Sequence, residues 1–326
     1  MKKKLFMFGM TAVCMIGLTA CNTSEKTAAK PSEKTAETKQ NSETTKPVNQ
    51  TITYLNKEYT IPNKVTKIAA ASLEAMEDAA ILGVKPAGAI TIGGKLPEYV
   101  ADDLQGAESI GEKTQPNFET LLTLKPDVIL GTDKFQPDVA EQLKKIAPMF
   151  PISHISTDWK ENLKLLAELT GKQSKADNII KQYEETVKKV KDQAGEDLKD
   201  KKAVIVRIRG GSLFLYPQDV YLNPVLYADL GMTVPEEIKA VKAQEAISLE
   251  KFAEMNPDYI YLQFEESENA DKPKALEELE SNPIWNSIQA VKNKQVFVNA
   301  IDPMYQGGTA LSKTTFLKAV EKTLLK

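Results

Sequence analysis

Two stretches of the chain share one pattern, NFETLLTLKPDVIL at residues 117–130 and SLEKFAEMNPDYIYL at residues 248–262. In each copy a polar residue opens a predicted helix, a glutamate (Glu119 or Glu250) stands two positions later, and a Pro-Asp pair starts seven residues after the glutamate. Proline ends the helix, because it has no N–H to donate and restricts the residue before it. The apolar run that follows is typical of a strand buried on both faces of a parallel sheet. The repeat therefore predicts two similar α/β lobes, with a ligand cleft beyond the carboxyl ends of their strands.

The composition limits what the chain can do. At 326 residues it has room for two domains, and its net charge of −3 gives no general field that would attract nucleic acid. Both cysteines, Cys14 and Cys21, lie near the start, and His154 is the only histidine. A folded body without cysteine has no disulfide, thiolate nucleophile or Cys-based metal site, and one histidine cannot supply a multi-imidazole metal site. We therefore expect neither a nucleic-acid partner nor a metal ion held by protein ligands.

Residues 1–20 have the features of a secretory signal peptide. Three lysines at positions 2–4 precede an apolar run that starts at Leu5 and is too short to span a membrane as a helix. The ending Leu-Thr-Ala-Cys at residues 18–21 resembles the bacterial lipobox, in which the cysteine is diacylated and becomes the mature N-terminus. Cys21 matches that position, although a plain signal peptide with an incidental cysteine is the alternative. Because two or three acyl chains hold a protein on a membrane almost irreversibly, we expect the body to be lipid-anchored on the extracellular face of the cell membrane.

The remaining chain divides by composition and pattern. Residues 21–50 are polar and predict a disordered stalk, whereas strands and helices alternate afterwards, as in parallel α/β folds. A helical region broken only at Gly171 separates two such parts, and its second half has one apolar stripe and a reach of about 30 Å, suited to a strut. The predicted parts are an N-terminal lobe at 51–157, a linking helical region at 158–195 and a C-terminal lobe at 196–326.

Individual elements are predicted from apolar runs and from turn residues. The expected helices cover 73–82, closed by Gly83, and 311–325. The expected strands cover 67–71, 86–91, 128–130, 149–155, 202–209, 212–216 after a Gly210-Gly211 turn, and 295–298.

The chain from about Ile61 to its end resembles the solute-binding lipoproteins of ABC importers for ferric siderophores, which are related to vitamin B12 and haem binding proteins. The motifs that carry the resemblance are the two glutamate-to-Pro-Asp stretches, VKPAG at 84–88, NPIW at 282–285 and AVKNKQV at 290–296. The lipobox and the stalk suit a Gram-positive member. The resemblance implies two lobes with central, mainly parallel sheets joined by one long helix, a siderophore captured between the lobes, and delivery to an ABC permease by a monomer.

By this resemblance, Glu119 and Glu250 are the exposed carboxylates, one on each lobe, that dock on arginines of the permease. A carboxylate in the first turn of a helix is also favoured by the helix dipole, so a capping role is the better explanation of either glutamate taken alone. A matched pair favours docking, because a two-fold importer needs two similar contacts and Arg–carboxylate bonds are strong and directional.

Arg207 and Arg209 are the sharpest indication of the ligand. They follow a buried apolar strand, and strand alternation places both guanidinium groups on one side. Charged residues at the carboxyl end of an internal strand belong at the crevice, where a planar fork of donors suits an anionic ferric complex. The alternative is a structural ion pair with an acidic residue of the same lobe.

Other candidates for ligand contact lie on loops that follow predicted strands. The first-lobe candidates carry positive charge: Lys95, Lys113 and Lys134. The second-lobe candidates could pack against an aromatic or aliphatic siderophore: Tyr221, Gln263, Phe264, Tyr305 and Gln306. Trp159, at the start of the linking region, is a further candidate or else a core residue, whereas His154 is expected to be structural.

The iron needs no protein ligand, because the chelator supplies its hard oxygen donors. An enzyme is disfavoured, since the chain has no P-loop, no dinucleotide fingerprint, no nucleophile elbow and no triad that His154 could serve. The remaining alternative within the binding class is haem or a corrinoid, with Tyr221 or Tyr305 as an axial ligand of haem.

Overall fold

The computed structural model describes residues 49–325. The predicted signal peptide, the predicted acylation site Cys21 and nearly all of the predicted stalk lie outside these residues. The first described element is a hairpin of β1 (Asn49–Tyr54) and β2 (Lys57–Pro62), so regular structure begins inside the end of the predicted stalk.

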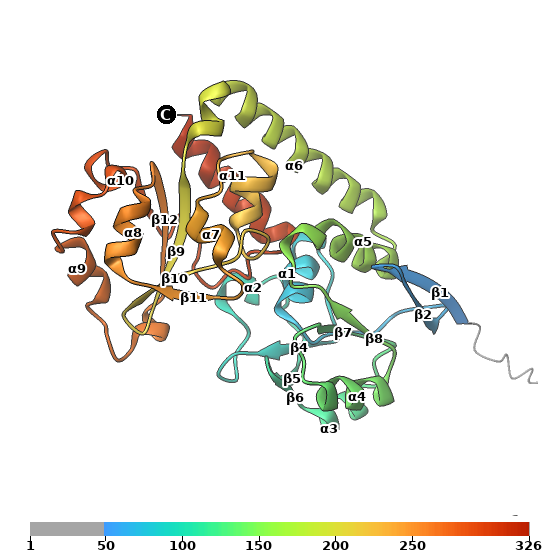
Figure 1. Ribbon diagram of the computed structural model, residues 1–326. Helices are drawn as coiled ribbons and strands as arrows, with labels where there is room; N and C mark the ends of the chain where they lie inside the picture. Colours follow the sequence, from blue (N-terminus) through green and yellow to red (C-terminus); the bar gives the residue numbers. More distant parts are fainter. Residues whose placement is uncertain (1–48, 326) are drawn as a thin grey trace, which may run out of the picture. The chain divides into compact units, whose positions relative to one another are not determined.

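The first lobe, defined here as elements β3 to β8, is built on a six-stranded sheet in the order β6-β5-β4-β3-β7-β8 (Figure 1). Its strands are β3 (Ile68–Ala70), β4 (Gly88–Thr91), β5 (Glu108–Glu112), β6 (Gln115–Pro116), β7 (Val128–Thr132) and β8 (Met149–Ile152). Its helices are α1 (Leu73–Leu82), α2 (Glu98–Ala101), α3 (Phe118–Leu124) and α4 (Pro137–Ile146). Every neighbouring pair of strands is parallel except β5 and β6. The carboxyl ends of these parallel strands therefore share one edge of the sheet.

The second lobe, defined as elements β9 to β13, has a five-stranded sheet in the order β11-β10-β9-β12-β13. Its strands are β9 (Ala203–Arg209), β10 (Ser212–Leu215), β11 (Glu245–Ile247), β12 (Tyr259–Phe264) and β13 (Val296–Val298). Its helical elements are η3 (Val225–Asp229), α7 (Glu236–Ala240), α8 (Leu249–Met255), η4 (Glu266–Asn269), α9 (Ala275–Glu280), η5 (Trp285–Ser287) and α10 (Gln289–Lys292). β10 is antiparallel to β9, because the Gly210-Gly211 turn, with φ of 56° and 76°, reverses the chain within two residues. β11 is antiparallel to β10.

The two lobes are joined by η1 (Ser156–Asp158), α5 (Trp159–Thr170), α6 (Gln173–Ala194) and η2 (Glu196–Asp200). The 22 residues of α6 span about 33 Å, and Figure 1 shows α6 running from α5 beside the first lobe toward the second. The final helix, α11 (Ala310–Leu324), packs against α1, α5 and α6. The prediction of two α/β lobes with mainly parallel sheets and a long connecting helix is confirmed.

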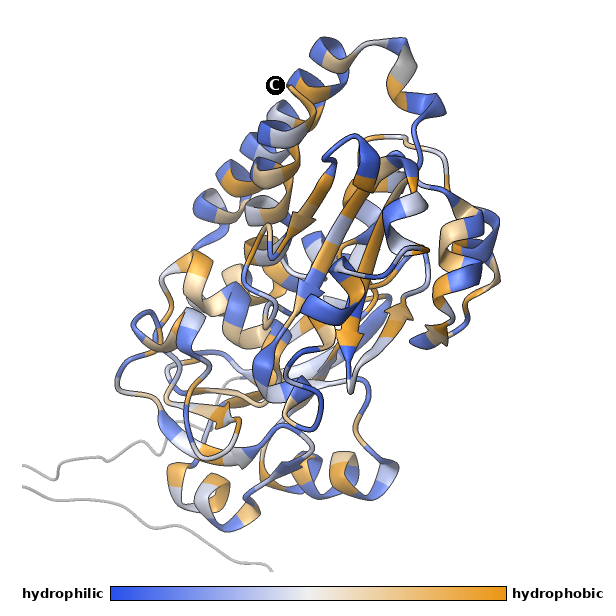
Figure 2. Ribbon diagram, turned by 90° about the vertical axis from the view of Figure 1, so that its left-hand side faces the viewer, coloured by the Kyte–Doolittle hydropathy of each residue, from blue (hydrophilic) through white to orange (hydrophobic). Residues whose placement is uncertain are grey.

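The core follows the hydrophobic pattern of the sequence. Figure 2 shows hydrophobic residues concentrated in the strands and alternating with hydrophilic residues along the helices. The apolar stripe of α6 is buried at Ile180, Tyr183 and Val190, as its spacing predicts.

The two copies of the repeat fold alike. Asn117 and Ser248 cap α3 and α8. The side-chain oxygen of each accepts a hydrogen bond from the backbone N–H of the residue three positions later, at 3.1 Å in α3 and 3.3 Å in α8. Each helix ends one residue before the proline, at Lys125 (φ 51°) and Asn256 (φ 44°), which adopt the left-handed conformation. The proline thus acts through the residue before it, which it excludes from the right-handed helical region.

The aspartate of each Pro-Asp pair caps a neighbouring strand, a role that the sequence did not indicate. The Oδ2 atom of Asp127 accepts hydrogen bonds from the backbone N–H groups of Thr66 and Lys67 at 2.7 and 2.8 Å. Asp258 accepts the backbone N–H of Lys202 at 2.9 Å in the second lobe. In both copies the aspartate therefore fixes the start of a central strand, β3 in the first lobe and β9 in the second. Each of these strands pairs with the strand of the repeat itself, β7 or β12.

Candidate functional site

A cavity of about 200 Å³, called the cleft below, lies where loops at the carboxyl ends of both sheets meet. The residues that line it from the first lobe are Leu73, Ile92, Lys113 and Lys134. Those from the second lobe and the following loop are Arg207, Arg209, Tyr216, Tyr221, Gln244, Glu268, Pro303, Met304, Tyr305 and Gln306. The position agrees with the general rule for ligands of α/β sheets.

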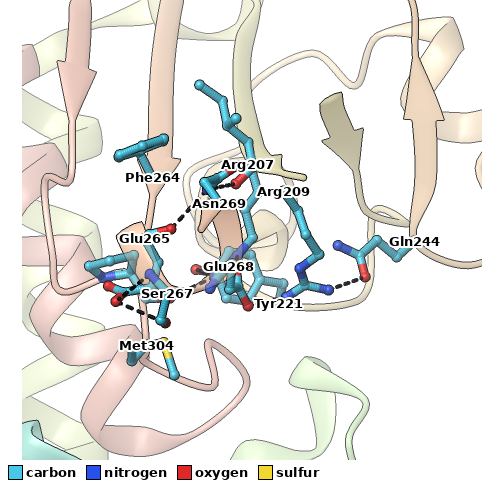
Figure 3. A network of polar contacts seen from close by, with 12 residues as sticks. Arg207, Arg209, Tyr221, Gln244, Phe264, Glu265, Ser267, Glu268, Asn269 and Met304 are labelled. Atoms are coloured by element: carbon cyan, nitrogen blue, oxygen red, sulfur yellow. Dashed lines mark hydrogen bonds and ion pairs between the residues drawn. The ribbon is translucent and has the colours of Figure 1, made fainter. Parts of the chain in front are cut away.

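Glu268 joins the two arginines on one side of the cleft (Figure 3). Its Oε2 accepts from Nε of Arg207 at 2.7 Å, and its Oε1 accepts from Nη2 of Arg209 at 2.6 Å. Burial alone would raise the pKa of Glu268, but the hydrogen bonds from Arg209 and Arg207 outweigh it and lower that pKa below its usual range. The alternative that sequence reasoning left open, an ion pair with an acidic residue of the same lobe, is therefore present for both arginines.

The two arginines differ in exposure and in remaining capacity. The side chain of Arg207 is 5% exposed, and its Nη1 donates to the carbonyl oxygen of Pro303 at 2.6 Å and to the hydroxyl of Tyr221 at 3.3 Å. The side chain of Arg209 is 40% exposed, and its Nη1 donates to Oε1 of Gln244 at 2.8 Å (Figure 3). Arg207 thus holds the wall of the cleft together, whereas Arg209 presents its edge to the solvent in the cleft.

Aromatic rings form the second feature of the cleft. Tyr216 and Tyr221 stack with ring centroids 4.7 Å apart, and Tyr221 is buried. A Cβ at Gly307 would lie 2.3 Å from the ring of Tyr221, so only glycine lets the loop before α11 pass this closely. Tyr305 packs on Tyr99 of α2, with centroids 4.6 Å apart. These contacts give the cleft apolar faces beside its charges.

Lys113 and Lys134 supply the charge of the first lobe. Lys113 lies in the turn between β5 and β6, and Lys134 in the loop between β7 and α4. Neither ammonium group has an ion pair or hydrogen bond among residues 49–325. Partial burial lowers the pKa of Lys113, and the positive charges of Lys134, Arg209 and Arg207 lower it further, although nearby Glu74 opposes them. A site that gathers like charges in this way favours an anion.

A buried polar junction connects the first lobe to the loop that carries Tyr305. Glu77 of α1 accepts hydrogen bonds from the hydroxyl of Tyr99 at 2.8 Å and from the backbone N–H of Gln306 at 2.6 Å, and from the hydroxyls of Thr309 and Ser312. The adjacent Asp78 accepts the backbone N–H of Ala310 at 3.2 Å, in the first turn of α11. Acidic side chains at the start of a helix are favoured by its dipole, so this junction holds the loop in place.

Four of the predicted ligand contacts are absent from the lining of the cleft, which corrects their placement. Lys95 is exposed in a tight turn, where its backbone pairs with Ile92. Gln263 was expected on a loop, but β12 continues through it, and its fully buried side-chain amide has no hydrogen-bond partner within the described chain. Trp159 is a core residue, 3% exposed, with its ring 5.0 Å from that of Tyr183. The other predicted second-lobe contact that is absent from the lining is Phe264.

Sequence reasoning missed several residues of the cleft. Glu268 lies in the acidic run 265–268, which has the composition of a solvated surface. Tyr216 and Gln244 carried no signal apart from their positions at the end of β10 and before β11. His154, expected to be structural, has Nδ1 2.8 Å from Oδ1 of Asp133 and does not line the cleft.

Glu119 and Glu250 are both exposed in the first turns of α3 and α8, and neither lines the cleft. In residues 49–325 no group of three or more His, Cys, Asp or Glu side chains is placed to hold a metal ion. No helix within the same residues is long and apolar enough to cross a membrane.

Two lobes with a charged cleft between them define the class of solute-binding proteins. Residues 68–300 match the family model described as Periplasmic binding protein, and the chain belongs to this family. The prediction that it is a binding protein rather than an enzyme is therefore confirmed.

The relatives of known name point to iron uptake. The chain is 49% identical over 288 residues to the Iron-uptake system-binding protein of Bacillus subtilis, covering 88% of this chain and 91% of the relative. The crystal structure of the triscatecholate siderophore binding protein FeuA from Bacillus subtilis, complexed with ferri-bacillibactin, matches at 50% identity and a TM-score of 0.79, over 84% of this chain and 98% of the other. Staphylococcus aureus SirA complexed with staphyloferrin B matches at 26% identity and a TM-score of 0.72, over 84% and 98%.

Proposed function

We propose that this chain captures a ferric siderophore of the tris-catecholate class in its cleft and delivers it to an ABC permease for iron uptake. The observation that carries the proposal is the convergence of four cationic side chains on one cavity, two from each lobe: Lys113, Lys134, Arg207 and Arg209. A ferric ion held by three doubly deprotonated catecholates is a trianion, and charge-assisted hydrogen bonds to its phenolate oxygens are strong. The similarity to a protein solved with ferri-bacillibactin supports the same ligand class.

The aromatic residues support the same proposal. Catechol rings carry their charge on one edge and present two apolar faces, so they need cations beside stacking surfaces. Tyr216, Tyr221 and Tyr305 line the cleft together with the cations. At about 200 Å³ the cleft is smaller than the common range of about 300–1,000 Å³ for ligand pockets, so a whole siderophore reaches beyond it.

Haem is the weaker proposal. An axial tyrosine binds iron as the phenolate, but the hydroxyl of Tyr221 already accepts a hydrogen bond from Arg207, and burial raises the pKa of Tyr221. The chain also lacks a histidine or cysteine in the cleft lining.

We further propose that Glu119 and Glu250 dock on the permease, and that acylated Cys21 tethers the protein to the outer face of the cell membrane. The exposure of one glutamate on each lobe, away from the cleft, supports docking. Replacement of Cys21 by serine should release the protein into the medium, whereas membrane retention of that variant would contradict the tether.

The ligand class is tested by quenching of intrinsic fluorescence with a panel of ferric siderophores. The panel contains ferric complexes of a tris-catecholate, a hydroxamate, a mixed catecholate–citrate chelator and citrate, together with haemin. We expect the tightest saturable quenching with the tris-catecholate complex. Tighter binding of haemin, with a Soret band on mixing, would replace the proposal by the haem alternative.

A further inference from the structure

A second cavity of about 180 Å³ adjoins the cleft on its first-lobe side. It is called the side chamber below. It shares Leu73, Lys113, Lys134 and Gln306 with the cleft, so the two lysines stand at the boundary between the two spaces. Phe135 belongs to the side chamber alone and adds an apolar surface. A ligand that fills the cleft and reaches beyond it therefore has a continuous path past the lysines.

Glu74 lines the side chamber from the first turn of α1. It is 4% exposed, and the only hydrogen bond to its carboxylate within the described part of the chain comes from its own backbone N–H. Buried carboxylates elsewhere in the molecule have partners from other segments, as Glu77 does at the start of α11. Glu74 is thus a buried acid that lines an open cavity with its hydrogen-bonding capacity largely unused.

The charges around Glu74 come from several elements. Lys134 and Lys113 face it across the side chamber and favour its ionised form. Glu77 and Asp78, on the same helix, and Tyr99 of α2 also interact electrostatically with Glu74. Burial raises the pKa of Glu74 above its usual value, and the two lysines offset part of this rise. The same two lysines therefore favour the ionised form of Glu74 in the side chamber and supply positive charge to the cleft.

We propose that the side chamber is a subsite for an uncharged, hydrogen-bond-donating arm of the chelator, such as an amide linker next to a catechol ring, and that Glu74 excludes a second anionic group from it. The inference rests on the proposed function and narrows its ligand class. An ionised carboxylate only accepts hydrogen bonds, so an amide N–H satisfies it. A carboxylate arm, as in citrate-based chelators, would meet the like charge of the buried Glu74.

The test compares wild type with Glu74→Gln and with Glu108→Gln, a matched control at an exposed position of β5 that lines neither cavity. Glutamine keeps the shape of the side chain and removes the charge, and loss of an unpaired buried charge should not unfold the protein. Affinities are measured by calorimetric titration with the ferric complex of a tris-catecholamide and with ferric dicitrate. We expect Glu74→Gln to strengthen ferric dicitrate binding about tenfold and to weaken tris-catecholamide binding, because a neutral amide oxygen accepts the linker N–H less strongly than a carboxylate does, whereas Glu108→Gln should match wild type with both complexes.

The pH dependence of the same titrations separates a charge effect from a change of shape. As the pH falls toward the raised pKa of Glu74, its protonation should strengthen ferric dicitrate binding to wild type and to Glu108→Gln, beyond any change seen in Glu74→Gln. An unchanged preference ratio in Glu74→Gln, or a pH profile identical to that of wild type, would overturn the inference while the proposed function stands. If wild type binds neither ferric complex, the proposed function fails, and the inference fails with it.

Discussion

The two lobes bring positive charge to the cleft in different ways. In the second lobe, Arg207 and Arg209 project from a central strand and are fixed by Glu268. In the first lobe, Lys113 and Lys134 extend from loops, and their ammonium groups have no ion pair within residues 49–325. The planar arginine fork suits a fixed wall, whereas lysine is a compact charge on a flexible stem. The difference indicates that the second lobe is organised before the ligand arrives and that the first lobe adapts to it.

The largest expected effect concerns the two glutamates, one on each lobe, that we propose to dock on the permease. Replacing Glu119 and Glu250 together by alanine should abolish iron uptake while siderophore affinity stays unchanged, because both glutamates lie outside the cleft. Each single replacement removes one charge-assisted contact, on the order of 1.5–3 kcal/mol, and should reduce uptake only in part. Uptake of radioactive iron and an equilibrium titration measure the two quantities. Normal uptake by the double variant would reduce both glutamates to helix-start residues.

Arg207→Ala should have the next largest effect, since this arginine supports the fixed wall. It leaves the carbonyl of Pro303 and one oxygen of Glu268 without their donor. We expect a loss of about 3 kcal/mol in the free energy of unfolding, measured with urea, together with much weaker ligand binding. Unchanged stability with lost binding would instead make Arg207 a direct ligand contact.

Lys113→Ala and Lys134→Ala should show the opposite pattern. Stability should change by no more than about 0.5 kcal/mol, because neither ammonium group supports the fold. Affinity for the ferric tris-catecholate should fall by roughly tenfold to a hundredfold for each, and the loss should shrink at high ionic strength. Lys95→Ala is the matched control, an exposed lysine outside the cleft, and its affinity should equal that of wild type. A loss as large in the control would point to the net charge of the surface rather than to the cleft.

The smallest expected effect is the pH dependence of stability that arises from α1. Burial raises the pKa values of Glu74, Glu77 and Asp78 in the folded protein. The folded state then binds more protons than the unfolded chain. The contribution of these groups to stability is therefore greatest below the usual glutamate pKa of 4.5, and it falls as the pH rises through their raised pKa values. Thermal unfolding measured at increasing pH from 4.5 upward should show a falling contribution of these groups to the midpoint, with a shallower fall in Glu74→Gln. An equally steep fall in that variant would assign the effect to other groups.

The sequence predicted local structure better than the partners of charged groups. The helix 73–82 was predicted to its residues, because Ser72 caps it and Gly83 ends it in the left-handed conformation. The same stretch gave no sign that Glu77 would meet the start of α11, since that contact joins residues more than 200 positions apart. Burial of such an acid is a property of the tertiary fold and leaves no periodic signal.

In the cleft, too, the sequence predicted local geometry but not the partners of the charged groups. Strand alternation placed Arg207 and Arg209 on one side, and both do bind Glu268. Strand alternation could not distinguish the buried Arg207 from the more exposed Arg209. The burial of Arg207 depends on the loop that supplies the carbonyl of Pro303. Gln263 and Trp159 were placed by their nearness to predicted strand ends and helix starts, and both turned out to be buried elsewhere because the neighbouring elements cover them.

The central claim is that cations from opposite lobes hold one anionic ferric siderophore. The most direct measurement titrates wild type and the triple variant Lys113→Gln, Lys134→Gln, Arg209→Gln with the same ferric tris-catecholate complex at one ionic strength. These three cations face the cleft and leave the support by Arg207 in place. We expect saturable one-to-one binding by wild type and a loss of at least about a thousandfold in the triple variant, with both proteins folded. Wild-type affinity in the triple variant would contradict the account.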